Sequence, residues 1–302
     1  MQLSFAHLSD PHLPMPENVD WRDLRNKRVL GYQSWHRKRY RIHRADVLKG
    51  MMADIADRGP DHVIISGDLV NIALEREFLA ATEWLKGVGT PDSVTVVPGN
   101  HDAYVRVPHS SGLQHWQPWM TGDDAAKSFP FVRKRGPVAF VMLSTAIPTR
   151  WFSAAGQLGQ QQLQELEKIL KSLATDEYFR VVVLHHPPED YPTKPRKALR
   201  DRAQFREVLA RQGAELVLHG HQHHSHFGNV KSPSGRTPVV GVPSASAALT
   251  LGKNKAARWN LFDVQKTESH WRLSVEGRAL TDSGFSTIGK WHMTVNMPEE
   301  ML

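Results

Sequence analysis

Five short apolar runs in this chain each lead into an aspartate, asparagine or histidine, and this arrangement constrains the fold more than any other sequence feature. The groups are DPH at 10–12, GD at 67–68, GNHD at 99–102, HHPP at 185–188 and GHQH at 220–223. In open α/β sheets, ligands bind at the carboxyl ends of the strands. If the apolar runs are strands, these five groups are expected to converge on one crevice.

The apolar runs alternate with helical patterns, which predicts an α/β domain. Strands are expected at residues 3–8, 62–65, 94–97, 138–143, 180–184, 215–218, 238–242, 259–264 and 270–275, and helices at 43–58, 75–86, 163–173 and 196–212. The later strands are less regularly separated by helices, which indicates a mixed sheet or a second sheet. Residues 14–41 and 104–136 lack clear periodicity and are expected to form functional loops.

The residue types at the strand ends suit divalent metal ions. Because the chain has no cysteine, any metal must be held by nitrogen and oxygen. Imidazoles mixed with carboxylates fit iron, manganese or zinc. One catalytic zinc needs about three protein ligands, whereas this chain offers at least seven candidates, enough for two ions that share a carboxylate.

Each motif is weak by itself. Asp10 could cap a helix, Gly-Asp and Asn-His-Asp are common in turns, and an isolated His185-His186 pair is more often structural. All five in order, each at a predicted strand end, favour a catalytic site instead. His219, His224 and His226 beside the last motif are expected to lie outside the ligand shell, while His109 and His115 could reach substrate without anything in the spacing requiring it.

The ordered motifs D-x-H, G-D, G-N-H-D, H-x-P and G-H-x-H resemble those of the calcineurin-like metallophosphoesterase superfamily over residues 2–226. The GQLG at 156–159, before a Gln-rich helix, resembles the bacterial cyclic-nucleotide-phosphodiesterase-like branch. The resemblance implies an α/β fold, a four-layer α/β/β/α sandwich of two mixed sheets flanked by helices. It assigns residues 1–275 to the phosphoesterase domain, with a basic insertion at 14–44 and a loop insertion at 104–136, and leaves 276–302 as a C-terminal extension.

The resemblance also implies a ligand set for two divalent ions, Fe, Mn or Zn. The first ion would be held by Asp10, His12, Asp68 and His223, and the second by Asp68, Asn100, His185 and His221. His101 would contact the phosphate and protonate or stabilise the leaving oxygen, and Asp102 would orient His101 from behind. The nucleophile would be a hydroxide that bridges the two metals.

The net charge of +7 is concentrated in one segment. Residues 21–44 contain nine Lys/Arg and one acid, so they carry +8 and the remainder sums to −1. Four aromatic residues are interleaved with these cations: Trp21, Tyr32, Trp35 and Tyr40. Three interpretations stay open: a solvated face, a cap that grips an anionic substrate and stacks an aromatic ring on a base, or a patch, Trp21 to Arg44, that rests on anionic lipid with its Trp and Tyr side chains at headgroup depth.

The sequence therefore predicts a dinuclear metallophosphoesterase that hydrolyses a phosphodiester, such as a cyclic nucleotide or a similar small diester. One alternative is a pyrophosphate or phosphodiester hydrolase acting on a membrane-associated lipid such as a UDP-sugar lipid; another is a non-catalytic scaffold, against which the intact ligand set argues. No nucleic-acid module is recognised. The chain begins without a signal-peptide pattern and has no apolar stretch of about 20 residues, so a cytoplasmic protein, possibly peripheral at the membrane, is expected.

Overall fold

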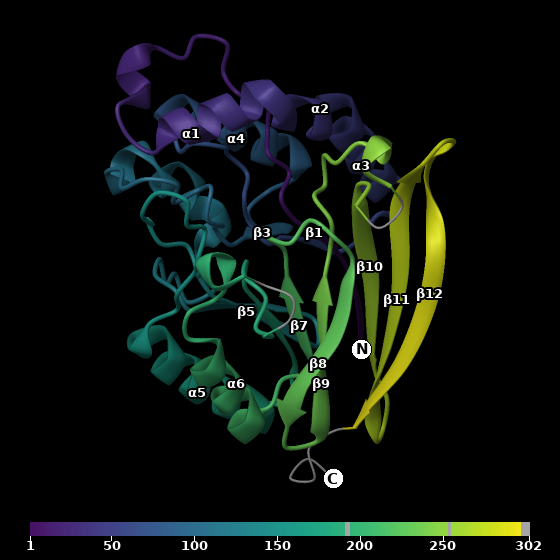
Figure 1. The fold of residues 1–302 in the computed structure, drawn as a ribbon. Helices are drawn as coiled ribbons and strands as arrows, with labels where there is room; N and C mark the ends of the chain where they lie inside the picture. The colour runs from purple at the N-terminus through teal and green to yellow at the C-terminus, as the bar shows by residue number, and fades with distance from the viewer. Residues whose placement is uncertain (191–193, 253–254, 297–302) are drawn as a thin grey trace.

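The structure, a computed structural model, describes residues 1–190, 194–252 and 255–296 as two sheets with helices on their outer sides (Figure 1). The first sheet has the order β12-β11-β10-β1-β2-β3 and the second β4-β5-β6-β7-β9-β8. The strands of the first are β1 (Gln2–Leu8), β2 (His62–Ile65), β3 (Val94–Val96), β10 (Arg258–Lys266), β11 (His270–Thr281) and β12 (Gly284–Asn296). Those of the second are β4 (Phe131–Arg135), β5 (Val138–Met142), β6 (Phe179–Val183), β7 (Leu216–His219), β8 (His226–Ser232) and β9 (Gly235–Gly241).

Both sheets are mixed, and their parallel strands define one functional edge. In the first sheet β1, β2 and β3 are parallel, and in the second β5, β6, β7 and β9 are parallel. Antiparallel strands border these parallel sets: β10 pairs with β1, β4 with β5 and β8 with β9. The carboxyl ends of the parallel strands within each sheet therefore meet at the same edge, as the sequence predicts.

Two apolar cores follow from side-chain alternation along the strands. In β5, Phe140 and its alternate neighbours enter the core between the sheets, where its ring packs edge-on against Phe5 at a centroid distance of 5.0 Å. Val141 faces the other way, into the core with helices α5 (Gln160–Thr175) and α6 (Arg202–Gln212). The helices α3 (Ala45–Arg58) and α4 (Glu75–Val88) bury their apolar stripes in the core of the first sheet. The four-layer α/β/β/α sandwich is thus confirmed.

The C-terminal boundary differs from the prediction. A division after residue 275 falls inside β11, and β12 pairs along the whole of β11, so residues 276–296 complete the first sheet instead of forming an extension. The sequence signal is weak there because both strands expose polar residues on one face and lack a continuous apolar run. Among the described residues, no helix is long and apolar enough to span a bilayer.

Two segments differ in their helical content. Residues 14–41, expected to be irregular, contain α1 (Arg28–Ser34) and a π-turn at Trp35–Arg39 that leads into α2 (Tyr40–Ile42). The helix expected at 196–212 begins only at Arg202, because Leu199 forms a β-bridge with Gly156 and the Asp201 carboxylate accepts hydrogen bonds from two backbone N–H groups of the 158–159 turn. We call residues 21–44 the cap, since they lie across the strand ends (Figure 1).

Candidate metal centre

The predicted ligands lie where the parallel strands end. Asp10 and His12 follow β1, Asp68 follows β2 and Asn100 follows β3, while His185 follows β6. His221 and His223 follow β7. Because the two sheets pack face to face, these loops from both sheets meet over one edge of the sandwich.

The residues predicted to hold the first ion are brought together. One ligand atom from each of Asp10, His12, Asp68 and His223 lies within 4.8 Å of all the others. The Nε2 atom of His223 is 3.0 Å from Asp10 Oδ1, and that of His12 is 3.8 Å from Asp68 Oδ2. This cluster of two carboxylates and two imidazoles is capable of binding a metal ion.

The residues predicted for the second ion are partly assembled. The Asn100 Oδ1 and His185 Nε2 atoms are buried without a hydrogen-bond partner, and His185 Nε2 is 3.4 Å from Asp68 Oδ2. A buried polar atom without a partner is costly unless something satisfies it, so these two atoms fit a cation. The ring of His221 lies beside that of His185, with centroids 5.2 Å apart, but its Nε2 atom donates to the Lys197 carbonyl.

Three imidazoles are oriented by backbone carbonyls of the loop after β2. The Nδ1 atoms of His185, His12 and His101 donate to the carbonyls of residues 66, 70 and 71, at 2.7, 3.3 and 2.6 Å. Since a carbonyl can only accept, each ring carries a proton on Nδ1, and the neutral form of each ring directs its Nε2 lone pair into the site. This is the arrangement that fixes the tautomer of a metal-binding or substrate-binding histidine.

The ligand loops hold strained backbone. Five of the seven predicted metal ligands have a positive φ, between 40° and 70°: Asp10, His12, Asp68, His221 and His223. Left-handed backbone at a non-glycine residue costs about 1 kcal/mol or more and is concentrated at functional sites. A Cβ added at Gly99 would collide with the Asp68 carboxylate, so this position requires glycine for the two loops to approach.

His101 lies in the centre as predicted, but Asp102 does not orient it. The Asp102 carboxylate accepts four backbone N–H groups, from residues 68, 69, 70 and 99, at 2.8–3.0 Å. It therefore joins the loops after β2 and β3, and the carbonyl of Asn71 orients His101 in its place. The sequence places Asp102 next to His101, but the direction of a side chain depends on backbone torsions that adjacency does not reveal.

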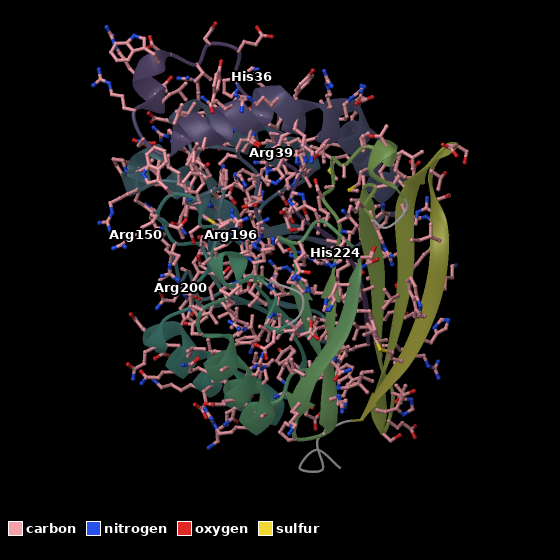
Figure 2. All side chains as sticks on the ribbon, viewed as in Figure 1. His36, Arg39, Arg150, Arg196, Arg200 and His224 are labelled. Carbon is pink, nitrogen blue, oxygen red and sulfur yellow. The ribbon has the colours of Figure 1, made fainter. Side chains whose placement is uncertain are left out.

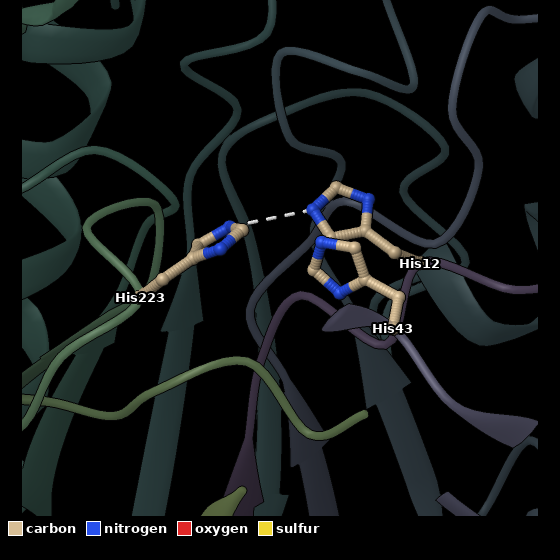
Figure 3. A group of neighbouring side chains, drawn as sticks. All are labelled: His12, His43 and His223. Carbon is tan, nitrogen blue, oxygen red and sulfur yellow. Dashed lines mark hydrogen bonds between the residues drawn. The ribbon is translucent and has the colours of Figure 1, made fainter. Parts of the chain in front are cut away.

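Sequence reasoning missed two site residues that come from the cap. Arg39 donates from Nη2 to His12 Nε2 at 2.9 Å and from Nη1 to His101 Nε2 at 3.2 Å, and its place beneath the cap helices is labelled in Figure 2. His43 packs against His12 and His223 (Figure 3), and these three histidines also offer ligand atoms within 4.8 Å of one another. The spacing of Arg39 and His43 in the sequence does not distinguish them from the other basic residues in the segment 21–44.

The electrostatics of the centre favour cations. Burial opposes ionisation of Asp10, but His223 holds the pKa of that carboxyl below its usual range. Burial likewise opposes a charged His185, yet Asp68 raises its pKa to about 9. Burial, with the Arg39 guanidinium nearby, lowers the pKa of His101 to about 3. Ionised carboxylates thus draw positive charge to the ligand cluster, while His101 stays neutral.

A cleft of about 630 Å³ opens over the ligands. Its walls include Asp68, Asn100, His101, His221 and His223. The cap forms one side and the segments 152–154 and 196–197 form the other. The centre is therefore open to a small substrate rather than sealed within the core.

A four-layer sandwich with candidate Asp, Asn and His ligands at the strand ends of both sheets is typical of the metal-dependent phosphoesterases as a class. Residues 3–225 match the calcineurin-like phosphoesterase family, and the chain belongs to that family. It is 26% identical over 228 residues to a protein of Synechococcus sp. named a probable cyclic nucleotide phosphodiesterase, a match that covers 74% of this chain and 80% of that one.

Solved structures share the fold. A dimetal phosphatase from Danio rerio superposes with a TM-score of 0.64 at 16% identity, covering 98% of this chain and 99% of the other. The purple acid phosphatase PPD1 of yellow lupin superposes with a TM-score of 0.63 at 12% identity, covering 97% of this chain and 54% of the other. At these identities the likeness concerns the fold.

Proposed function

We propose that this protein is a two-metal phosphoesterase that cleaves a small phosphodiester, such as a cyclic nucleotide. The observation that carries the proposal is the set of buried ligand atoms at the floor of an open cleft: a complete group around Asp10, and the unpartnered atoms of Asn100 and His185 beside Asp68. The name of the Synechococcus relative supports the choice of a diester over a monoester.

The chain's own residues would divide the work as follows. Asp10, His12, Asp68 and His223 would hold one divalent ion, and Asp68, Asn100, His185 and His221 the other. Two such ions supply Lewis acidity and a bound water of lowered pKa at neutral pH. Two further groups that face the cleft, His101 and Arg39, touch each other.

His101 and Arg39 would act on the phosphoryl group itself. The Nδ1 proton of His101 is held by the Asn71 carbonyl, so only Nε2 can reach the substrate. Arg39 presents its guanidinium to that same atom, and a guanidinium matches phosphate oxygens in charge and geometry. We expect the phosphoryl oxygens to take the place of His101 as the acceptor for Arg39. The anionic phosphate would then favour a proton on His101 Nε2, which would contact the leaving oxygen.

A metal and activity assay tests this function. The wild type, loaded with Mn²⁺, Fe²⁺ or Zn²⁺ and desalted, should carry about two ions per chain and hydrolyse bis(p-nitrophenyl) phosphate and a cyclic nucleotide. Asp68→Ala, which removes the carboxylate shared by both ligand groups, should lose the ions and the activity together. Wild-type protein that binds at most one ion, or that cleaves monoesters but no diester, would contradict the proposal.

Exposed aromatic residues favour a second candidate, a lipid-linked diester or pyrophosphate. Phe152, on the wall of the cleft, is 70% exposed, and Trp151 beside it is 53% exposed. On the cap, Trp21 is 65% exposed and Arg25 lies over its ring. Exposed aromatics flanked by cations are typical of surfaces that rest on lipid headgroups.

Sedimentation with liposomes separates the two candidates. A lipid-acting enzyme should bind vesicles containing about 30% anionic lipid, with a loss of about 1 kcal/mol per cation removed. The double variant Arg37→Gln/Arg41→Gln changes two exposed cap residues outside the cleft, and Lys171→Gln on α5 is the matched control. Equal sedimentation of all three proteins at low salt would leave the soluble diester as the substrate.

A further inference from the structure

The cleft is far more basic than cleavage of a single phosphodiester requires. Its walls carry six cations and a single acid, the metal-ligand candidate Asp68. The cations are Lys27, Lys38, Arg39, Arg196, Lys197 and Lys255. Two arginines outside the cleft are neutralised by carboxylates, Arg180 by Glu215 and Arg76 by Asp23. Within residues 1–190, 194–252 and 255–296, none of the six cleft cations forms such a pair with a carboxylate.

Lys27 is the most informative of these cations, because it is buried without a counter-charge. It is 7% exposed, and its Nζ atom donates to the Thr149 hydroxyl and the Ser153 carbonyl, both at 2.7 Å, while lying 4.5 Å from the centre of the Tyr104 ring. Burial lowers the pKa of Lys27 to about 8, so the charge is costly to keep here. Neutral partners thus hold the ammonium at the wall of the cleft, where its positive charge faces an incoming anion.

The surroundings of Lys27 form a connected structure on both sides of the cleft. The Ser153 residue that receives Lys27 also donates from its hydroxyl to the Arg196 carbonyl at 3.2 Å, which joins the cap to the segment that carries Lys197. Arg196 in turn donates to the Phe152 carbonyl. Arg39 and Arg196, both labelled in Figure 2, line the cleft from the cap and from the segment before α6. Lys27 and Arg39 are thus held in place by the surrounding structure, and the exposed Lys197 lies on the segment bonded to the same serine.

The cap is held firmly enough to position these charges. α1 packs so closely on the loop after β2 that a Cβ at Gly31 would collide with the Ile72 side chain. Arg28 donates to the carbonyls of Ile72 and Ala73. At the other end of the cap, the backbone N–H of Arg44 donates to the Ser246 carbonyl at 2.8 Å. Both ends of the basic segment are therefore fastened to the body of the protein.

Charge balance then identifies the substrate class. The single negative charge of a cyclic nucleotide lies on the scissile phosphate, where the metal ligands, His101 and Arg39 already face it. It leaves Lys27 and Lys197 on the walls of the cleft without a negative counter-charge. We infer that the substrate carries a second phosphate group, bound between the cap and residues 149–154 and 196–197, as in a phosphoanhydride-linked or bisphosphorylated nucleotide. This inference rests on the proposed function and narrows it.

Binding of two phosphonates to the metal-loaded protein tests the inference by calorimetry. Methylenediphosphonate, which has two anionic groups, should bind the wild type at least about tenfold more tightly than methylphosphonate, the difference that one charge-assisted hydrogen bond supplies. Lys27→Met should remove most of that advantage, with the bound metal unchanged by elemental analysis. Lys197→Gln, an exposed position whose backbone carbonyl still serves His221, is the second variant in case Lys27→Met fails to fold.

The outcomes separate the inference from the function on which it rests. Lys171→Gln, on the outer side of α5, is the matched control and should bind both phosphonates as the wild type does. An equal affinity of the wild type for the two ligands overturns the inference, and so does a bisphosphonate advantage that survives in both cleft variants, because the metals alone would then hold it. If either of these two outcomes is found and the wild type still hydrolyses bis(p-nitrophenyl) phosphate, the proposed function stands without the second phosphate site.

Discussion

Replacing Asp102 with alanine should damage the stability of this protein more than its chemistry. The carboxylate is buried, and its two oxygens share four backbone donors: Oδ1 accepts from Leu69 and Val70, and Oδ2 from Asp68 and Gly99. These donors are buried as well. Truncation to alanine leaves all four N–H groups of the ligand loops without their acceptor.

The size of the effect follows from these bonds. An unsatisfied buried donor costs about 1 kcal/mol or more, so four of them cost about 4 kcal/mol, a large part of the typical stability of a domain. Asp102→Asn should cost about half as much, because one oxygen is kept and the amide nitrogen opposes only the two donors on the other side. Burial, with Asp68 nearby, raises the pKa of Asp102 to about 7, so the neutral amide also removes an unfavourable buried charge.

Chemical denaturation in the presence of a chelator measures this loss without the contribution of bound metal. A catalytic orienting role makes the opposite prediction: normal stability, normal metal content and a large fall in kcat in both variants. If Asp102→Ala unfolds at the wild-type denaturant concentration, the structural role assigned to Asp102 is wrong. Thr175→Ala, at the exposed end of α5, gives a reference for an ordinary surface change.

Three further predictions concern the site and the core. His101→Ala should keep its metal and lose kcat by about 10²- to 10⁴-fold, with a smaller loss for a p-nitrophenyl leaving group, which hardly needs a proton; an equal loss for good and poor leaving groups would point to stabilisation of phosphoryl oxygens alone. Arg39→Met should lower kcat/KM by about 10²-fold without lowering metal affinity, because the guanidinium now occupies the His12 Nε2 lone pair; loss of metal would show instead that Arg39 supports the ligand shell. His62, buried between the sheets, has its pKa lowered from 6.5 to about 3 by burial and then by Arg135 and Arg133. The unfolded chain therefore takes up this proton first as the pH falls, so stability decreases between about pH 6.5 and 3 by up to about 1.4 kcal/mol per unit, and His62→Gln should reduce that slope by one proton in denaturation measured across the range.

The sequence by itself determined the strands that carry the site and the ligands at their ends. This succeeded because the apolar runs before Asp68 and His185 are short, continuous and followed at once by turn residues, a local signal that survives without tertiary information. Parallel strands then bring their carboxyl ends together by geometry alone. The convergence of the five motifs could be foreseen for that reason, whereas the grouping of ligands around Asp10 came from the resemblance to the phosphoesterase family.

Only the tertiary structure decided which other side chains join them. Arg39 and His43 reach the centre because the cap docks on the loop after β2 through close contacts at Gly31. These contacts join segments that are distant in the sequence, so the spacing of the residues does not predict them. Asp102 joins two loops because its carboxylate meets donors that are remote in sequence. The last strand, β12, was missed for a related reason: its stability comes from pairing with β11, and a half-exposed strand has little apolar pattern of its own.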